Sequence, residues 1–140
     1  MQYQDYKHII PVQIRFSDID RLDHVNNACY HNYIELGRVT YFGEILKGHV
    51  QWDKQGFVLA RTEINHILPI FLEDEIFCCT KIFKVGTKSI TIKNTLLRKE
   101  KTQLLACADA IGVLVASDYI QNMSIPVPHS WRQCIEAYEK

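Results

Sequence analysis

The sequence predicts an α+β domain in which one antiparallel sheet wraps around one long helix. Five segments show the apolar alternation of half-buried strands, and apolar residues between the first two recur every three or four positions, as in a buried helix. The last strand carries small residues on one face, which would let a helix approach closely; these are Ala106, Ala108, Ala110 and Gly112. A length of 140 residues is that of a single domain, 1–140.

The first strand is expected over residues 10–16, where Ile10 and Phe16 bracket a strict apolar alternation. A polar stretch follows, and then the long helix. Asn26 or Asn27 is a natural N-cap for that helix, and Gly48 is a natural stop.

After Gly56 the chain reads as four strands, over residues 57–68, 75–85, 89–97 and 104–115. Gly86-Thr87-Lys88 joins the second of these strands to the third as a hairpin turn. The chain ends in a short amphipathic helix whose apolar face runs from Trp131 to Tyr138, with Ser130 and Gln133 as its expected cap.

Composition and charge exclude several classes of protein. The chain is 47% hydrophobic and 23% charged, and no apolar run reaches the roughly 20 residues of a membrane span. Sixteen basic and sixteen acidic side chains cancel, whereas a nucleic-acid binder needs a basic surplus. The first residues, Met1 to Asp5, lack the pattern of a signal peptide, so a cytoplasmic protein without a nucleic-acid or membrane partner is expected.

Five cysteines occur in an arrangement that suits neither disulfides nor zinc. Their number is odd, Cys78 and Cys79 are adjacent, and no CxxC pair is present. They are expected to be small core residues in a reducing compartment, with no metal and no redox cofactor.

A basic strip stands out on this neutral chain. Between Lys81 and Lys101 only one acid accompanies seven basic residues, which are Lys81, Lys84, Lys88, Lys93, Arg98, Lys99 and Lys101. The strip indicates either a site for a small phosphate-bearing ligand or the solvated face of a hairpin, and the residues alone leave both interpretations open.

The polar stretch from Arg15 to Asn27 is the densest group of chemically useful side chains. It lies between a strand and the N-terminus of the buried helix, where free N–H groups carry a partial positive charge. A carboxylate held there could act on an electrophile whose developing oxyanion rests on those N–H groups. The same residue types also make helix caps and turns, so this second interpretation stays open, and it is preferred for Asp18.

The string Asp18-Ile-Asp20-Arg-Leu-Asp-His24-Val-Asn26-Asn27-Ala-Cys-Tyr30 resembles hotdog-fold acyl thioesterases, and among them the 4-hydroxybenzoyl-CoA thioesterase-like enzymes. The resemblance continues weakly through Leu68-Pro69 and residues 85–89 to residues 125–128. It implies a hotdog fold and hydrolysis of an acyl-CoA thioester to the free acid and CoA.

The resemblance also implies roles for individual residues. The catalytic carboxylate corresponds to Asp20, as base or nucleophile, and the helix-start amide that polarises the thioester carbonyl corresponds to Asn27. His24 and Asn26 line the same turn and would position substrate or water. The family's contact region for the CoA phosphates corresponds to the hairpin residues Gly86, Thr87, Lys88 and Ser89.

Leu22 stands where acyl-carrier-protein thioesterases carry an asparagine, which weakens a carrier-protein substrate without excluding it. A non-catalytic acyl-CoA-binding or assembly module on the same fold is the other alternative. One helix cannot cover both faces of a five-stranded sheet, and its edge strands need partners, so a homodimer or homotetramer is expected.

Overall fold

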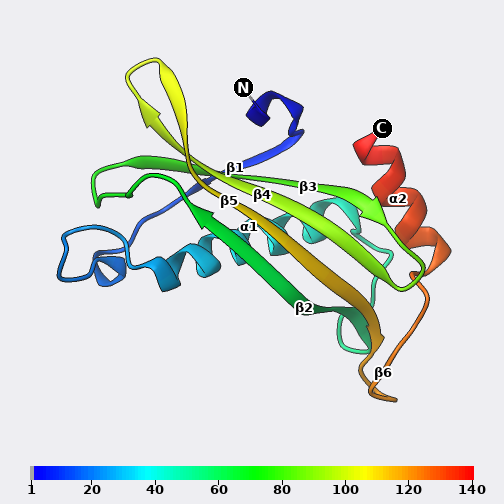
Figure 1. Cartoon of the computed structure of the whole chain (residues 1–140). Coiled ribbons are helices and arrows are strands. Elements are labelled where there is room, and N and C mark those ends of the chain that lie inside the picture. Colours follow the sequence, from blue (N-terminus) through cyan, green and yellow to red (C-terminus); the bar gives the residue numbers. More distant parts are fainter. Residues whose placement is uncertain (1) are drawn as a thin grey trace.

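The computed structural model describes residues 2–140 and shows a strongly curved antiparallel sheet wrapped around a single long helix (Figure 1). The 3₁₀ turns η1 and η2 span Gln2–Asp5 and Phe16–Asp18. The helices are α1, Asn27–Ile45, and α2, His129–Glu139. The strands are β1, His8–Val12; β2, Gln55–His66; β3, Glu75–Val85; β4, Ser89–Glu100; β5, Gln103–Asp118; and β6, Met123–Ser124.

The strands lie in the order β1-β3-β4-β5-β2, and the short β6 pairs with the end of β5. Every pair is antiparallel, so the predicted sheet around one central helix is confirmed, with β6 as an addition. Strand β3 has its predicted bounds, whereas β4 and β5 extend beyond theirs. The two outer strands of the five-stranded order are β1 and β2.

The first strand is shorter than its apolar alternation predicts. It ends at Val12, and Phe16 begins a 3₁₀ turn with its side chain 83% exposed. The cause is the carboxylate of Asp18, which accepts a hydrogen bond from the Arg15 N–H at 3.0 Å and turns the chain back on itself. A local side-chain bond therefore overrides the strand pattern.

Helix α1 approaches the sheet most closely at β3. A Cβ on Gly37 would lie 2.5 Å from Cys78 Sγ and 2.8 Å from Thr80 Oγ1, so only glycine fits there. The predicted close approach thus exists, but the side chains directly beneath Gly37 belong to β3 rather than to the small residues of β5.

One of those small residues, Ala106, faces away from the helix. A bulge shifts the β4–β5 pairing between Leu96 and Leu97, so Leu96 pairs with Ala108 and Leu97 with Ala106. Ala106 therefore joins the small cluster on the outer face, beside Tyr6, instead of the core beneath α1.

Helix α2 begins at His129 with Pro128 as its N-cap, so the predicted Ser130 cap is wrong. The preceding proline presets the backbone there and no side-chain cap bond forms. Trp131 and Ile135 bury the predicted apolar face, at 2% and 1% exposed.

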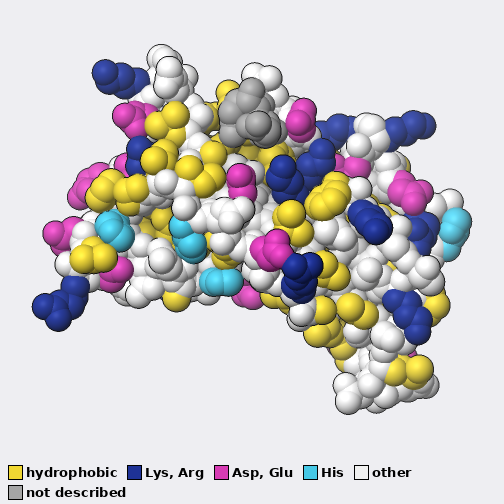
Figure 2. Space-filling model, viewed as in Figure 1, with side chains coloured by type: hydrophobic (Ala, Val, Ile, Leu, Met, Phe, Trp, Pro, Cys, Tyr) yellow, Lys and Arg dark blue, Asp and Glu magenta, His cyan; other side chains and the backbone are white. Residues whose placement is uncertain are grey.

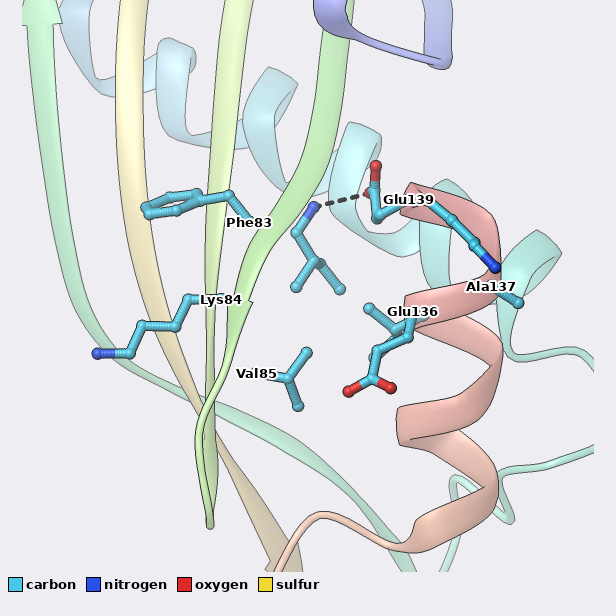
Figure 3. Close-up of a pocket in the computed structure, with 9 residues that line it drawn as sticks. Phe83, Lys84, Val85, Glu136, Ala137 and Glu139 are labelled. Carbon is cyan, nitrogen blue, oxygen red and sulfur yellow. Dashed lines mark hydrogen bonds between the residues drawn. The ribbon is translucent and has the colours of Figure 1, made fainter.

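A groove of about 680 Å³ separates α2 from the free end of β3 (Figure 3). Two side chains of α2 bridge it. Glu139 accepts hydrogen bonds from Tyr41 Oη at 2.6 Å and from the Ile82 N–H at 2.9 Å, while Arg132 donates to the Gly86 carbonyl at 2.6 Å. Two of these bonds satisfy backbone groups, the Ile82 N–H and the Gly86 carbonyl. Both groups lie beyond the reach of β1, which pairs only with residues 76–80 of β3.

The five cysteines are free thiols, and three are fully buried in the sheet. Burial raises the pKa of Cys78 to about 11, of Cys107 to about 11 and of Cys79 to about 12. Such thiols stay protonated at neutral pH, which agrees with their expected role as small core residues. No helix within residues 2–140 has the length and apolar content needed to cross a membrane.

Candidate active site

The polar stretch folds into a narrow turn directly before α1. Ile19 and Val25 form an antiparallel bridge, and at its tip the Asp20 N–H donates to the His24 carbonyl at 3.1 Å. The Asp23 N–H donates to the Asp20 carbonyl at 3.1 Å, and Asp23 adopts the left-handed conformation with φ of 63°. Asp20 and His24 therefore lie side by side at the mouth of one turn.

This turn is attached to the body of the protein on both sides. The Asn26 N–H donates to the Asp18 carbonyl at 2.8 Å, and the Val25 N–H donates to the Ile70 carbonyl at 2.7 Å. Val25 is fully buried, and the His24 ring contacts the Phe71 ring edge-on at 6.2 Å between centroids. The turn is thus a fixed platform rather than a loose loop.

The N-terminus of α1 presents one free backbone amide. Asn26 is the N-cap: its Oδ1 accepts from the Ala28 N–H at 3.0 Å, and its carbonyl accepts from the Cys29 N–H at 2.8 Å. The Asn27 N–H, first in the helix, has no intrahelical acceptor and carries the positive end of the helix dipole. A developing oxyanion would find both a donor and a favourable field there.

Asp20 is half-buried, and its orientation is set by the turn. Its Oδ1 accepts from the Leu22 N–H at 2.8 Å, which uses one carboxylate oxygen and holds the side chain in place. Asp20, His24, Asn26 and Asn27, the four residues predicted from the polar stretch, therefore share one turn at one helix end.

Asp18 is the second carboxylate of the stretch, and its role is structural, as preferred from the sequence. It is 1% exposed and accepts from Tyr33 Oη at 2.6 Å and from the Arg15 guanidinium at 2.9 Å. Burial alone would raise the pKa of the Asp18 carboxyl, but the hydrogen bonds from Tyr33 and Arg15 outweigh it and hold that pKa below its usual range.

A histidine that the sequence did not single out as functional lies beside this site. The His66 ring at the end of β2 contacts the Tyr30 ring edge-on, with 4.6 Å between centroids, and His66 is exposed. Tyr30 belongs to the first turn of α1 and donates from its hydroxyl to the Leu68 carbonyl at 3.4 Å. The sequence carries no signal for this neighbourhood, because tertiary folding alone brings the end of β2 to the start of α1.

The structure does not bring the hairpin residues 86–89 to this turn within one chain. The hairpin lies at the opposite end of α1, beside α2 (Figure 1). There the Val127 N–H donates to the Thr87 carbonyl at 2.9 Å, and the Gly86 N–H closes the turn on the Ser89 carbonyl at 2.7 Å. A helix of 19 residues separates the two places by about 28 Å.

The basic strip is dispersed in the structure. Arg98 is largely buried and bonds to the Pro69 carbonyl at 2.8 Å and to Glu100 at 3.0 Å, while Lys99 pairs with Glu75 at 4.0 Å. Figure 2 shows basic side chains scattered among acidic ones on the visible face. Lys88 remains exposed at the hairpin.

Among residues 2–140, no three His, Cys, Asp or Glu side chains are grouped so that they could hold a metal ion.

A model of the thioesterase-like superfamily matches residues 14–135 of the chain. The chain belongs to the thioesterase-like superfamily. The match of this thioesterase-like protein spans both the turn before α1 and the hairpin at residues 86–89.

Solved structures agree with this assignment. A thioesterase from Thermus thermophilus, complexed with coenzyme A and Zn, is 31% identical with a TM-score of 0.85, over 97% of this chain and 96% of that one. A thioesterase-superfamily protein from Jannaschia sp. CCS1 shares the fold at 19% identity and a TM-score of 0.83, over 92% and 90% of the two chains.

A 4-hydroxybenzoyl-CoA thioesterase variant, complexed with 4-hydroxybenzoyl-CoA, shares the fold at 17% identity and a TM-score of 0.82, over 91% and 96% of the two chains. No curated protein matches the chain significantly. The resemblance drawn from the turn before α1 is thus confirmed at the level of family and fold.

The structural role of Asp18 can be tested by Asp18→Ala. Removal of a buried carboxylate leaves the Tyr33 hydroxyl unpaired, so the free energy of unfolding at pH 7 should fall by about 2–4 kcal/mol. Because folding lowers the pKa of Asp18, its stabilisation is present above the ordinary carboxyl pKa of about 3.9 and is lost as the pH falls through the folded value.

Urea unfolding of wild type and variant at pH 7 and pH 3 measures this effect, and the difference in unfolding free energy should narrow at pH 3. The exposed Glu73→Ala serves as control and should change little at either pH. An equal loss for Asp18→Ala at both values would contradict a stabilising ionised carboxylate.

Proposed function

We propose that this protein hydrolyses an acyl-CoA thioester to the free acid and CoA. The observation that carries the proposal is that one rigid turn holds the Asp20 carboxylate and leads directly into the Asn27 N–H at the start of α1. Membership of the thioesterase-like superfamily supports thioester hydrolysis as the reaction. The 31% identical thioesterase complexed with coenzyme A supports CoA as the thiol part of the substrate.

In this mechanism the thioester carbonyl oxygen lies at the Asn27 N–H, which stabilises the negative charge that develops on it. Asp20 either removes a proton from a water that attacks the carbonyl carbon, or attacks that carbon itself and forms an anhydride that water then cleaves. In both routes the C–S bond breaks, the thiolate of CoA leaves and takes up a proton, and the acid is released. Both routes use the same two groups.

His24 and Asn26 have supporting roles in this proposal. The His24 ring stands at the mouth of the turn against Phe71, where it would position the substrate or the water. The Asn26 side chain already caps α1, so it acts on the substrate by fixing the direction of the Asn27 N–H. Free thiols throughout the chain support a reducing compartment, and the cytoplasm is the proposed location.

The hairpin can contribute to this site only from a second chain. Strand β2 is an unpaired edge that exposes Val58 and Leu59, at 50% and 42%, and the neighbouring face of α1 exposes Val39 at 60%. If β2 paired with β2 of a second copy about a two-fold axis, the corresponding elements of the two protomers would run in opposite directions. The hairpin of one protomer then comes to the end where the partner's turn lies, so the site is completed in a homodimer or a dimer of dimers.

Asp20→Asn tests the chemistry, because it keeps the shape of the side chain but removes the base or nucleophile. The kcat for hydrolysis of the best substrate in a panel of acyl-CoAs should fall by at least about 10²-fold, with substrate binding largely kept. Asp23→Asn changes the same residue type in the same turn and should retain activity. A wild-type protein that binds acyl-CoA without turnover would instead indicate a binding module, and wild-type turnover by Asp20→Asn would remove Asp20 from the mechanism.

Lys88→Ala tests whether the Lys88 side chain binds the CoA phosphates. Because these exposed contacts act alike on the ground and transition states, KM for acyl-CoA should rise several-fold while kcat changes little. The effect should weaken with salt and vanish for a short thioester that lacks the nucleotide. Lys84→Ala, on the neighbouring strand, is the matched control; an unchanged KM for Lys88→Ala at low ionic strength would place the phosphates elsewhere.

The assembly is tested by size-exclusion chromatography with light scattering. We expect two or four copies of the 16.3 kDa chain and no folded monomer at micromolar concentration, because β2 and its apolar neighbours need cover. A folded, active monomer would contradict a site built from two chains.

A further inference from the structure

A pocket of about 300 Å³ opens on the outer face of the sheet, on the side away from α1. The neighbouring residues Ile82 and Ile92 point the other way and are buried in the core with α1. The pocket is called the outer pocket below, and its walls are formed by Asp5, Tyr6, Lys81, Phe83, Lys93 and Ile111. It therefore shares no residue with the turn before α1 or with the hairpin at residues 86–89.

Strand pairing brings two lysines of the basic strip together in this pocket. Lys81 of β3 lies directly opposite Lys93 of β4, and both side chains are half-buried. The Cβ atoms of directly opposed residues are about 5 Å apart, and like charges in that position destabilise a sheet. The folded chain thus keeps two ammonium groups side by side at a cost that its own packing does not explain.

Neither lysine forms an ion pair with an acidic side chain of residues 2–140. Glu63, in the same row of side chains across the sheet, is paired with Arg61. Asp109, in the next row, accepts a hydrogen bond from the Thr95 hydroxyl at 3.0 Å. Asp5 lines the outer pocket but is exposed and pairs with neither lysine. The lining therefore carries two positive charges and one negative charge, which favours an anionic ligand with a single charge.

The rest of the lining offers apolar surface. Phe83 and Ile111 are 52% and 39% exposed, and Figure 3 shows the Phe83 ring directed away from α2. The opposite wall is fixed, because Tyr6 is buried and its hydroxyl is hydrogen-bonded to Thr95 Oγ1 at 2.8 Å. Carbon surface thus lies beside the two ammonium groups, an arrangement that suits a molecule with one charged end and one apolar end.

We propose that the outer pocket binds the carboxylate of an apolar organic acid. The carboxylate lies between the ammonium groups of Lys81 and Lys93 and relieves their repulsion, while the hydrocarbon part covers Phe83 and Ile111. A phosphate dianion fits less well, because it has no apolar part and because Asp5 repels two charges more strongly than one. The free acid released in the proposed hydrolysis belongs to this class of ligand, but binding in the outer pocket does not depend on that reaction.

A benzoate titration of the whole assembled protein, followed by NMR, tests the outer pocket. The backbone amide signals of Lys81, Lys93 and Ile111 should shift with benzoate concentration. Acetate lacks the ring and should bind at least about 10-fold more weakly, because it buries little apolar surface. Benzyl alcohol lacks the charge and should bind at least about 5-fold more weakly. Absence of these shifts, shifts confined to the turn before α1, or binding of benzoate no tighter than that of acetate or benzyl alcohol would overturn the proposal.

Lys93→Glu gives a second test, because stability and binding should change in opposite directions. The new carboxylate would pair with Lys81 across the strands, so the urea midpoint of unfolding should rise. It would also repel the ligand, so benzoate binding should weaken by about 10-fold or more. Lys84→Glu makes the same charge change on β3 outside the outer pocket, and it should leave benzoate binding within about 2-fold of wild type.

Two results with these variants would contradict the proposal. If Lys93→Glu and Lys84→Glu weaken benzoate binding equally, the acid responds to the net charge of the protein rather than to this pocket. If Lys93→Glu lowers the urea midpoint, the two lysines do not repel each other, and the argument for a missing anion fails. Because neither measurement requires turnover, both results stand whether or not the protein hydrolyses acyl-CoA.

Discussion

The buried carboxylate of Asp18 is the constraint on which the candidate site depends. Its carboxylate receives hydrogen bonds from Arg15, just before the 3₁₀ turn η2, and from Tyr33, in the second turn of α1. Its backbone carbonyl receives a hydrogen bond from the Asn26 N–H. One residue thus joins the strand side, the turn and the helix. Because these bonds favour the ionised form, they outweigh the cost of burying the charge and fix where α1 begins.

The direction of the helix is set by a second constraint, the contact of Gly37 with Cys78 and Thr80 of β3. A helix that lies this close to the sheet buries Tyr30, Ile34 and Tyr41 in the core and leaves its other face outside it. That outer face carries Leu36 and Val39, which are exposed in the single chain. The same packing that orients the Asn27 N–H therefore also leaves the apolar surface that the proposed second chain would cover.

The length of α1 keeps apart two groups of residues, the turn and the hairpin, for which the family resemblance implies roles in one site. The turn with Asp20 lies at one end of α1, and the β3–β4 hairpin that carries Lys88 lies toward the other. The proposed acyl-CoA substrate is an extended molecule with a phosphate-rich end and a reacting thioester, so under that proposal the hairpin and the turn must act on it at once. The antiparallel pair of chains proposed above would meet this need with one set of residues.

The sequence by itself determined the elements that rest on local physics. Periodicity located the long helix and four of the strands, the pair Asn26 and Asn27 marked the helix start, and the string from Asp18 to Tyr30 identified the family. Asp20, His24 and Asn27 could be placed together because only a short stretch of chain separates the first from the last. Short-range turns and caps leave a readable signal in residue types.

Only the tertiary structure decided the features that depend on contacts between distant segments. It turned Ala106 to the outer face through a bulge and set His66 against Tyr30. It also buried Asp18 beneath the hydroxyl of Tyr33, a contact that the turn role preferred from the sequence does not include. The reason is physical: burial and cross-strand register are properties of the packed chain, and a one-residue bulge reverses which side of a sheet a residue faces without any change in the local pattern.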